Sequence, residues 1–158
     1  MRSKHTHLSI GTISHGTMRP EDLIPEFLDA LDGIRLSKRD RNHVRAIRAR
    51  SEKPGYYETD EAHWDLDEDL WELLSAYAPP LCYAGSTEGD GSDYGIWPIL
   101  DDEDTLKVNQ PPMPGQFPAD IRTCYEVNDH GNVTLWVKKI WTHRGFERSK
   151  WVAVWYVV

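Results

Sequence analysis

Two spacings of hydrophobic residues divide the chain. Up to about residue 77, large apolar side chains recur every three to four positions, which places them on one side of a helix. From residue 81 onward they gather in short runs rich in β-branched and aromatic residues, which favour strands. Helices followed by strands predict an α+β fold in which N-terminal helices pack on one C-terminal antiparallel sheet of about five strands.

Three helices are predicted in the first half. The first begins at Pro20, which suits a first helical turn, and ends at Gly33. The second follows Ser37, a good N-terminal cap, and runs to about residue 50. The third covers residues 65 to 77 and ends before two consecutive prolines. The helical part is therefore expected at about 19–78 and the sheet part at about 81–158.

Five strands are predicted in the second half, and a short N-terminal strand is predicted near residues 5 to 13. The five runs cover residues 81–84, 94–97, 121–127, 133–141 and 151–158. The segment from Asn128 to Asn132 is rich in residues that tolerate positive φ, so it predicts a hairpin turn between two of these strands. Residues 109–118 hold four prolines and are expected to form an extended connector.

Composition favours one soluble globular domain over residues 1–158. The chain has 158 residues, of which 39% are hydrophobic and 28% charged, enough to form a core without a structural metal. Two cysteines, Cys82 and Cys124, are too few for a disulfide framework, so buried thiols are expected. No apolar run is long enough for a signal peptide or a membrane span, which predicts a cytoplasmic location without membrane association.

Charge is distributed very unevenly along the chain. The net charge of -8 argues against a whole-molecule attraction to nucleic acid or to anionic membranes. Residues 35–53, however, contain eight basic and two acidic side chains, whereas residues 54–106 contain fifteen acidic side chains and no Lys or Arg. This asymmetry indicates that charged surfaces determine what the protein binds.

Each charged segment has two interpretations. The basic segment 35–53 either contacts phosphates along a nucleic-acid groove or neutralises the acidic segment of the same molecule. The acidic segment is either a solubilising face or a recognition surface for a basic protein groove. A dense array of carboxylates can occupy a groove that is built for the closely spaced phosphates of DNA.

Candidate chemistry is sparse. His5 and His7 would point to one side of a strand, but a third metal ligand at a recognisable spacing is missing, so we expect no metal site and no cofactor. The glycine-rich string from Glu88 to Gly95 fits neither an EF-hand register nor a phosphate-binding loop, and a tight turn is the favoured interpretation. A candidate loop site remains there, formed by Asp90, Asp93, His15 and His130.

Three segments carry a resemblance to a group of proteins: Ser14 to Leu31, Gly89 to Trp97, and Asn128 to Leu135. Together they resemble small uncharacterised acidic proteins encoded by bacteriophages and other bacterial mobile elements, a group with no assigned activity. The resemblance implies a context in which small acidic proteins often antagonise host machinery that handles nucleic acid, as anti-CRISPR and anti-restriction proteins do.

The leading hypothesis is a non-enzymatic acidic protein that engages and inhibits a basic, nucleic-acid-handling host protein complex. No catalytic residue is assigned. A small hydrolase-like enzyme with its site at the loop from Gly89 to Gly95 is the alternative, and direct nucleic-acid binding by residues 35–53 is the less favoured third. The oligomeric state stays open, a homodimer included. The expected partner-binding residues are Asp65, Asp67, Glu68, Asp69, Glu72, Asp101, Asp102, Glu103 and Asp104.

Overall fold

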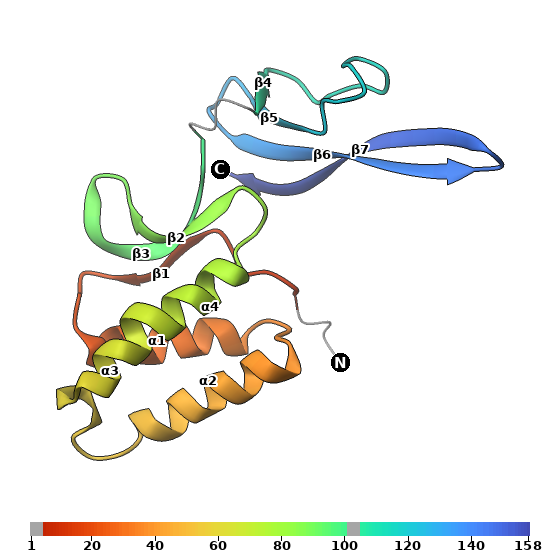
Figure 1. Cartoon of the computed structure of the whole chain (residues 1–158). Coiled ribbons are helices and arrows are strands. Elements are labelled where there is room, and N and C mark those ends of the chain that lie inside the picture. The colour runs from red at the N-terminus through yellow and green to blue at the C-terminus, as the bar shows by residue number, and fades with distance from the viewer. Residues whose placement is uncertain (1–4, 101–104) are drawn as a thin grey trace. The chain divides into compact units, whose positions relative to one another are not determined.

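The computed structural model describes residues 5–100 and 105–158. The chain forms two compact units, the first ending at Ile99 and the second beginning at Leu100, and each is described by itself. Figure 1 shows helices together with a small sheet in the first unit and a second sheet in the other. The α+β class is confirmed, whereas the prediction of a single domain stays a prediction. Among the described residues, no helix is both long and apolar enough to cross a membrane.

The first unit contains a three-stranded antiparallel sheet with strand order β1-β3-β2. These strands are Gly11–His15, Asp90–Pro98 and Cys82–Thr87, respectively. β3 is the central strand, and the four later strands form a separate sheet instead of extending this one. The prediction of one sheet of about five strands is therefore wrong, because the strands divide between two sheets and β2 and β3 belong to the unit of the helices.

Three helical stretches accompany this sheet. The first two, α1 (Pro20–Asp32) and α2 (Lys38–Ser51), match the predicted helices, and the Ser37 hydroxyl caps α2 by accepting the backbone N–H of Asp40. After the short turn η1 (Tyr56–Glu58), the third stretch begins five residues earlier than predicted, because the Thr59 hydroxyl caps it. That stretch consists of α3 (Asp60–Trp64), the π-helical segment η2 (Asp65–Leu70) and α4 (Trp71–Ala76).

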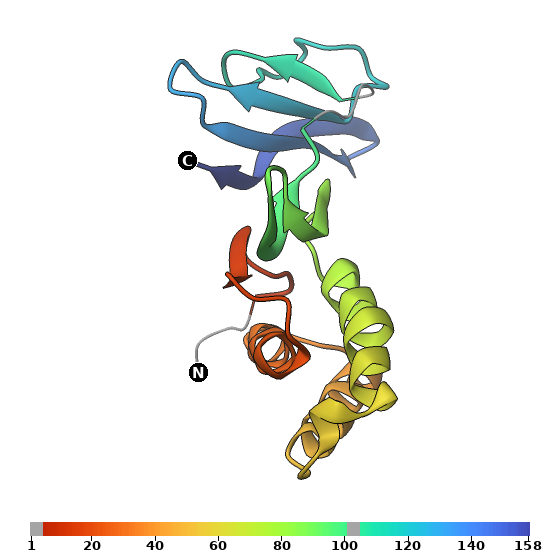
Figure 2. The ribbon, with the colours of Figure 1, turned by 90° about the vertical axis from the view of Figure 1, so that its left-hand side faces the viewer.

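The core of the first unit lies between the helices and the sheet (Figure 2). α1 contacts β1 and α4 contacts β2, so both helices cover the same sheet. Three rings join these layers: Phe27 of α1 lies edge-on to Trp71 of α4 at 4.8 Å and to Tyr94 of β3 at 6.4 Å. Fully buried Ile24, Leu28, Leu31, Leu70 and Leu74 fill the space around them, which explains the helical spacing seen in the sequence.

The second unit is a four-stranded sheet with strand order β4-β5-β6-β7. Its strands are Leu106–Val108, Thr123–Val127, Val133–His143 and Phe146–Val157. β4 was not predicted, and its parallel pairing with β5 is an exception to the antiparallel pattern. The predicted hairpin turn is confirmed, because the Asn128 side chain accepts the backbone N–H groups of His130 and Asn132 between β5 and β6.

Candidate functional site

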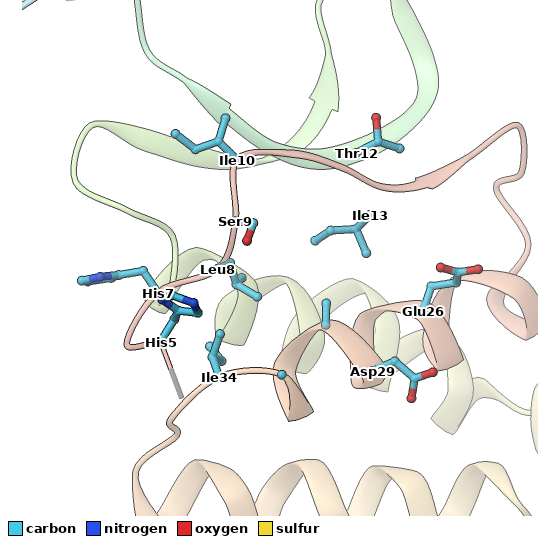
Figure 3. A pocket seen from close by; sticks show the side chains of 12 residues that line it. His5, His7, Leu8, Ser9, Ile10, Thr12, Ile13, Glu26, Asp29 and Ile34 are labelled. Atoms are coloured by element: carbon cyan, nitrogen blue, oxygen red, sulfur yellow. The ribbon is translucent and has the colours of Figure 1, made fainter. Parts of the chain in front are cut away.

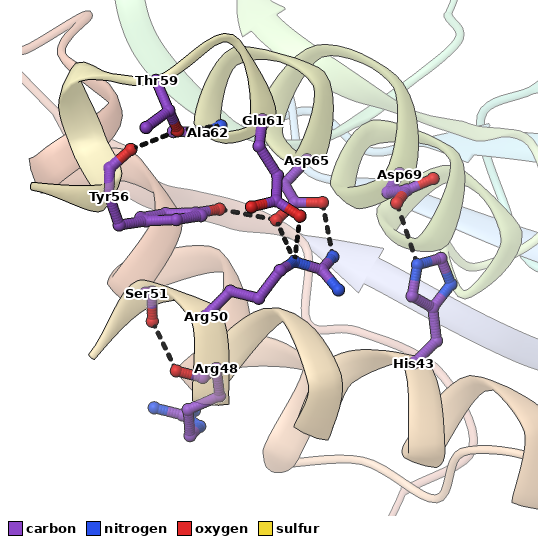
Figure 4. Close-up of polar contacts among 10 residues, drawn as sticks. All are labelled: His43, Arg48, Arg50, Ser51, Tyr56, Thr59, Glu61, Ala62, Asp65 and Asp69. Carbon is purple, nitrogen blue, oxygen red and sulfur yellow. Dashed lines mark hydrogen bonds and ion pairs between the residues drawn. The ribbon is translucent and has the colours of Figure 1, made fainter. Parts of the chain in front are cut away.

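A polar network joins α2 to the third helical stretch (Figure 4). The Arg50 guanidinium donates to both carboxylate oxygens of Asp65, at 3.0 Å and 2.6 Å, and it also lies 3.4 Å from a Glu61 oxygen. The Tyr56 hydroxyl donates to Asp65 at 2.6 Å. Burial, followed by the hydrogen bond to Asp65, raises the pKa of the Tyr56 hydroxyl above its usual range. The network fixes the helices against each other.

The burial of Asp65 corrects its predicted role. Its side chain is only 2% exposed, and its carboxylate accepts three hydrogen bonds from Arg50 and Tyr56. An external partner cannot reach it, so Asp65 is a structural residue of the helix pair and not part of a binding surface.

The basic segment pairs in part with acids of its own unit, and only some of these, such as Asp65 with Arg50, belong to the acidic segment as one of its two interpretations predicted. His43 Nε2 lies 2.9 Å from an oxygen of Asp69, so Asp69 is also partly engaged within the chain. One guanidinium nitrogen of Arg48 contacts Asp29 at 2.8 Å and Asp32 at 2.7 Å. Hydrogen bonding to Asp29 is the largest cause that raises the pKa of Arg48. Part of the α2 charge is thus used inside the molecule.

Other carboxylates of the third helical stretch face solvent. Asp60, Asp67, Glu68 and Glu72 are all exposed, and no hydrogen bond or ion pair joins their side chains to another residue in the described part of the chain. Trp64, in the same stretch, is 64% exposed. We call these five residues the acidic stripe. The predicted acids Asp101, Asp102, Glu103 and Asp104 lie outside the described residues.

The stripe follows from helical geometry. Asp60, Trp64, Glu68 and Glu72 succeed one another at intervals of four residues, and side chains three or four apart lie on the same side of a helix. The inward positions Asp65 and Asp69 face α2. The π-helical turn of η2 lies in the middle of the stretch, and such turns occur frequently at functional sites. Sequence analysis did not single out Trp64, although a large aromatic residue at the spacing of the exposed acids was a usable signal.

The pairing of β1 with β3 brings together three of the four residues of the candidate loop site. His15 Nε2 lies 3.1 Å from Asp90 Oδ2, and His15 pairs in register with Asp93 across β1 and β3. His130 belongs to the other unit, in the turn before β6. One buried oxygen of Asp93, Oδ1, has no hydrogen-bond partner among the described residues. The loop therefore holds an exposed imidazole and carboxylate pair.

The hydrogen bonds of this loop are those of a tight turn and do not activate a nucleophilic side chain. Asp90 Oδ1 accepts the backbone N–H of Ser92 at 3.0 Å and its hydroxyl at 2.8 Å, as the turn interpretation predicts. The backbone hydrogen bond from Ser92 is the largest cause that lowers the pKa of Asp90. Because the Ser92 hydroxyl donates to Asp90 and not to His15, the arrangement does not activate that serine.

A surface pocket of about 380 Å³ lies between the segment that leads into β1 and the helix α1 (Figure 3). Leu8, Ile13 and Ile34 provide apolar walls, and Glu26 and Asp29 of α1 provide carboxylates on one side. His5 and His7 lie at its other end. In the described part of the chain, no group of three or more His, Cys, Asp or Glu side chains is arranged to hold a metal ion.

Neither thiol is poised as a nucleophile. Burial raises the pKa of Cys82 to about 12 and that of Cys124 to about 11, so both thiols stay protonated at neutral pH. Both are free cysteines, as expected from the sequence.

Comparisons with known proteins give no family to which the chain can be assigned. No family model matches it, and no curated protein or solved structure is significantly similar to it.

Proposed function

We propose that the protein binds, through the acidic stripe, a basic surface of a protein complex that handles nucleic acid, and that it inhibits this complex without catalysis. One observation supports the proposal most. The helix directs Asp65 and Asp69 toward Arg50 and His43 of α2, whereas Asp67, Glu68 and Glu72 stay exposed and unpaired within the described residues. Their charge is therefore available to an external cationic surface.

Trp64 adds an apolar anchor to the charged surface. An exposed Trp at the centre of a polar patch is costly in water but valuable in an interface, where Trp is enriched among the residues that contribute most binding energy. Asp67 and Glu68, three and four residues later, flank the ring with negative charge. The indole would supply affinity by burial, and the carboxylates would supply orientation and a fast approach to a basic partner.

Inhibition follows from competition for a phosphate-binding groove. Side chains four residues apart are about 6 Å apart along a helix, so Glu68 and Glu72, with Asp67 beside them, form a short row of negative charge. Such a row can occupy a groove lined by Lys and Arg and exclude the nucleic acid that the groove normally holds. The resemblance to proteins of mobile elements is consistent with inhibition, because such elements benefit from blocking host nucleic-acid-handling complexes.

The test is capture of host proteins by the full chain, with mass spectrometry to identify the partner. We expect the captured partner to be a basic, nucleic-acid-binding protein that is released by raised salt, since salt screens exposed charges. A variant that combines Asp67→Lys, Glu68→Lys and Glu72→Lys should lose the partner. Trp64→Ala should weaken its binding without changing the salt dependence.

A matched charge reversal serves as control. Glu26→Lys, Glu88→Lys and Asp120→Lys change the net charge by the same amount at exposed positions outside the stripe, and this variant should retain the partner. If both triple variants retain the partner, or both lose it, the stripe is not the binding surface. A partner that binds equally well in low and high salt would also contradict the proposal.

A second candidate function, a small hydrolase-like enzyme, is favoured only by the contact between His15 and Asp90. An imidazole beside a carboxylate can act as a general base toward a bound substrate. If the protein hydrolyses a substrate, His15→Ala, Asp90→Ala, Asp93→Ala and His130→Ala are the variants that test the site. Activity that survives all four substitutions would remove this candidate.

A further inference from the structure

The strands β6 and β7 continue past the rest of their sheet as a two-stranded ribbon. β5 pairs with β6 only as far as Val137, whereas β6 and β7 stay paired up to His143 and Phe146. Figure 1 shows this extension in blue, running beyond β5. We call residues 138–151 the ribbon. Every residue from 141 to 150 is exposed, so the ribbon is the least covered regular element of its unit.

The pairing register sorts the ribbon side chains onto two faces. One face carries three cross-strand pairs, which are Lys139 with Lys150, Trp141 with Arg148, and His143 with Phe146. The other face carries Lys138 with Trp151, Ile140 with Ser149, and Thr142 with Glu147. Directly opposite residues share a face because side chains alternate along each strand. The first set, which we call the aromatic-basic face, combines two large rings with three permanent cations.

The two rings of this face are open to solvent. Trp141 is 44% exposed and Phe146 is 71% exposed. On the other face, by contrast, the Trp151 ring lies edge-on to Phe117 with 6.0 Å between ring centroids. The Lys138 ammonium lies 5.2 Å from the centroid of the Trp151 ring. The Pro-rich connector therefore covers the ring of the second face and leaves the rings of the first uncovered.

The charge of the ribbon differs sharply from that of the whole chain. Five of the seven Lys and Arg residues after position 106 lie in the ribbon, together with a single acid, Glu147. No ion pair joins the charged groups of Lys139, Arg148 or Lys150 to another residue within the described ranges. The net charge of -8 acts only weakly here, because at physiological ionic strength charges are screened over about 8 Å.

We propose that the aromatic-basic face binds single-stranded DNA or RNA. Proteins hold single strands by combining cations that follow the phosphates with aromatic rings on which bases stack. Trp141 and Phe146 supply two exposed ring faces, and Lys139, Arg148 and Lys150 supply the cations beside them. Side chains of one face recur about every 6.8 Å along a strand, so each ring has a cation at a neighbouring position of the same face.

Other anionic partners fit the face less well. In duplex DNA the bases are already stacked on each other, so exposed rings reach them only after costly unstacking. A membrane would favour an apolar hairpin tip, but the tip residues here are Arg144 and Gly145. The proposal is independent of the acidic stripe, which belongs to the other unit.

The test measures binding of the full chain to a fluorescein-labelled 20-nucleotide strand by anisotropy over a series of salt concentrations. We expect binding at low salt that weakens as salt rises, with a log-log slope near -2 if three cations contact phosphates at about -0.7 each. Arg148→Gln combined with Lys150→Gln should reduce that slope by about 1.4. Trp141→Ala should weaken binding by about fivefold or more, because stacking on a base is lost.

Matched variants separate the face from the rest of the unit. Lys107→Gln with Arg122→Gln removes two exposed cations of the same unit outside the ribbon, and Thr142→Ala changes the opposite face, so both should bind like the parent chain. Circular dichroism confirms that each variant is folded. The proposal is overturned if no strand binds at low salt, or if the Lys107 and Arg122 variant loses binding while Trp141→Ala keeps it.

Three further results would overturn it by identifying another occupant. The first is tighter binding to a duplex of the same length, and the second is binding only to vesicles of phosphatidylserine and phosphatidylcholine. The third is a chain that binds no oligonucleotide but forms a dimer in light scattering, which Trp141→Ala dissociates. A result on the acidic stripe changes none of these measurements, because the variants of the stripe leave the ribbon intact.

Discussion

Arg50 and Asp65 form a bidentate ion pair in which the acid is buried and the base is partly exposed, with N–O distances of 3.0 Å and 2.6 Å. The pair joins the most basic helix of the chain to the most acidic one. Part of each charged segment is therefore engaged with the other, and the charges outside these pairs are available for partners.

Asp65→Asn should lower the free energy of unfolding by about 3 kcal/mol, since it leaves Arg50 and Tyr56 facing a neutral group in a buried place. This loss of stability is at the lower end of the range for breaking a buried ion pair, because Arg50 still lies 3.4 Å from Glu61. Urea unfolding followed by circular dichroism measures the change. The control Asp67→Asn, two residues away and exposed, should stay within about 0.5 kcal/mol of the parent.

Tyr56 should make the protein sensitive to alkali. Its pKa is raised in the folded state, so the folded chain holds this proton more tightly than the unfolded chain does. The corresponding stability is fully present below about pH 10, the pKa of an unfolded tyrosine, and is lost as the pH rises above it. Urea midpoints measured between pH 8 and pH 11.5 should therefore fall less steeply in Tyr56→Phe. The exposed Tyr156→Phe should retain the parent slope, and equal slopes in all three proteins would contradict the prediction.

Gly95 lies in β3 where its backbone approaches the paired strand β1 closely. A Cβ atom there would lie 2.1 Å from the Gly11 carbonyl oxygen, so Gly95→Ala must displace the backbone of β1. We expect a loss of about 1–3 kcal/mol of stability, the usual cost of overpacking. Gly91→Ala, in the same strand with no atom within 4 Å of the new Cβ, is the matched control. Thermal unfolding midpoints of both variants test this prediction. A midpoint of Gly95→Ala equal to that of Gly91→Ala would contradict the close approach of β1.

The two thiols should be slow to react in the folded protein. With pKa values of about 12 for Cys82 and about 11 for Cys124, the thiolate fraction at pH 8 is more than about 100-fold below that of an ordinary cysteine. Alkylation by iodoacetamide, followed by mass spectrometry, should be slow in buffer and fast in 8 M urea. Rapid modification of either cysteine in the folded chain would show that its burial is weaker than described.

Local patterns predicted the elements well and their assembly poorly. The spacing of Leu23, Phe27 and Leu31 was enough for α1, and Ser37 was enough for the start of α2, because periodicity and capping depend on neighbouring residues. The short β4 was missed, since three residues without clear alternation give no signal. The prediction of a single sheet was wrong because strand pairing joins distant residues: β3 pairs with β1 and β2, whereas the later strands pair with each other.

The sequence also predicted the composition of the candidate sites but not the contacts that form them. The sequence indicated a strongly acidic segment, but it could not tell Asp65, which faces Arg50, from Asp67, which faces solvent. The contact between His15 and Asp90 joins residues 75 positions apart, and only the pairing of β1 with β3 brings them together. The aromatic-basic face likewise needs the register of β6 and β7.

The sequence by itself determined the α+β class, the three helices, most strands, and the separation of basic from acidic charge. Periodicity, turn residues and net charge are properties of neighbouring positions, so they can be read along the chain. The tertiary structure decided which charges neutralise each other, which stay exposed, and which rings lie beside which cations. Those outcomes depend on contacts between distant residues, because burial and pairing are set by what the fold brings within a few ångströms.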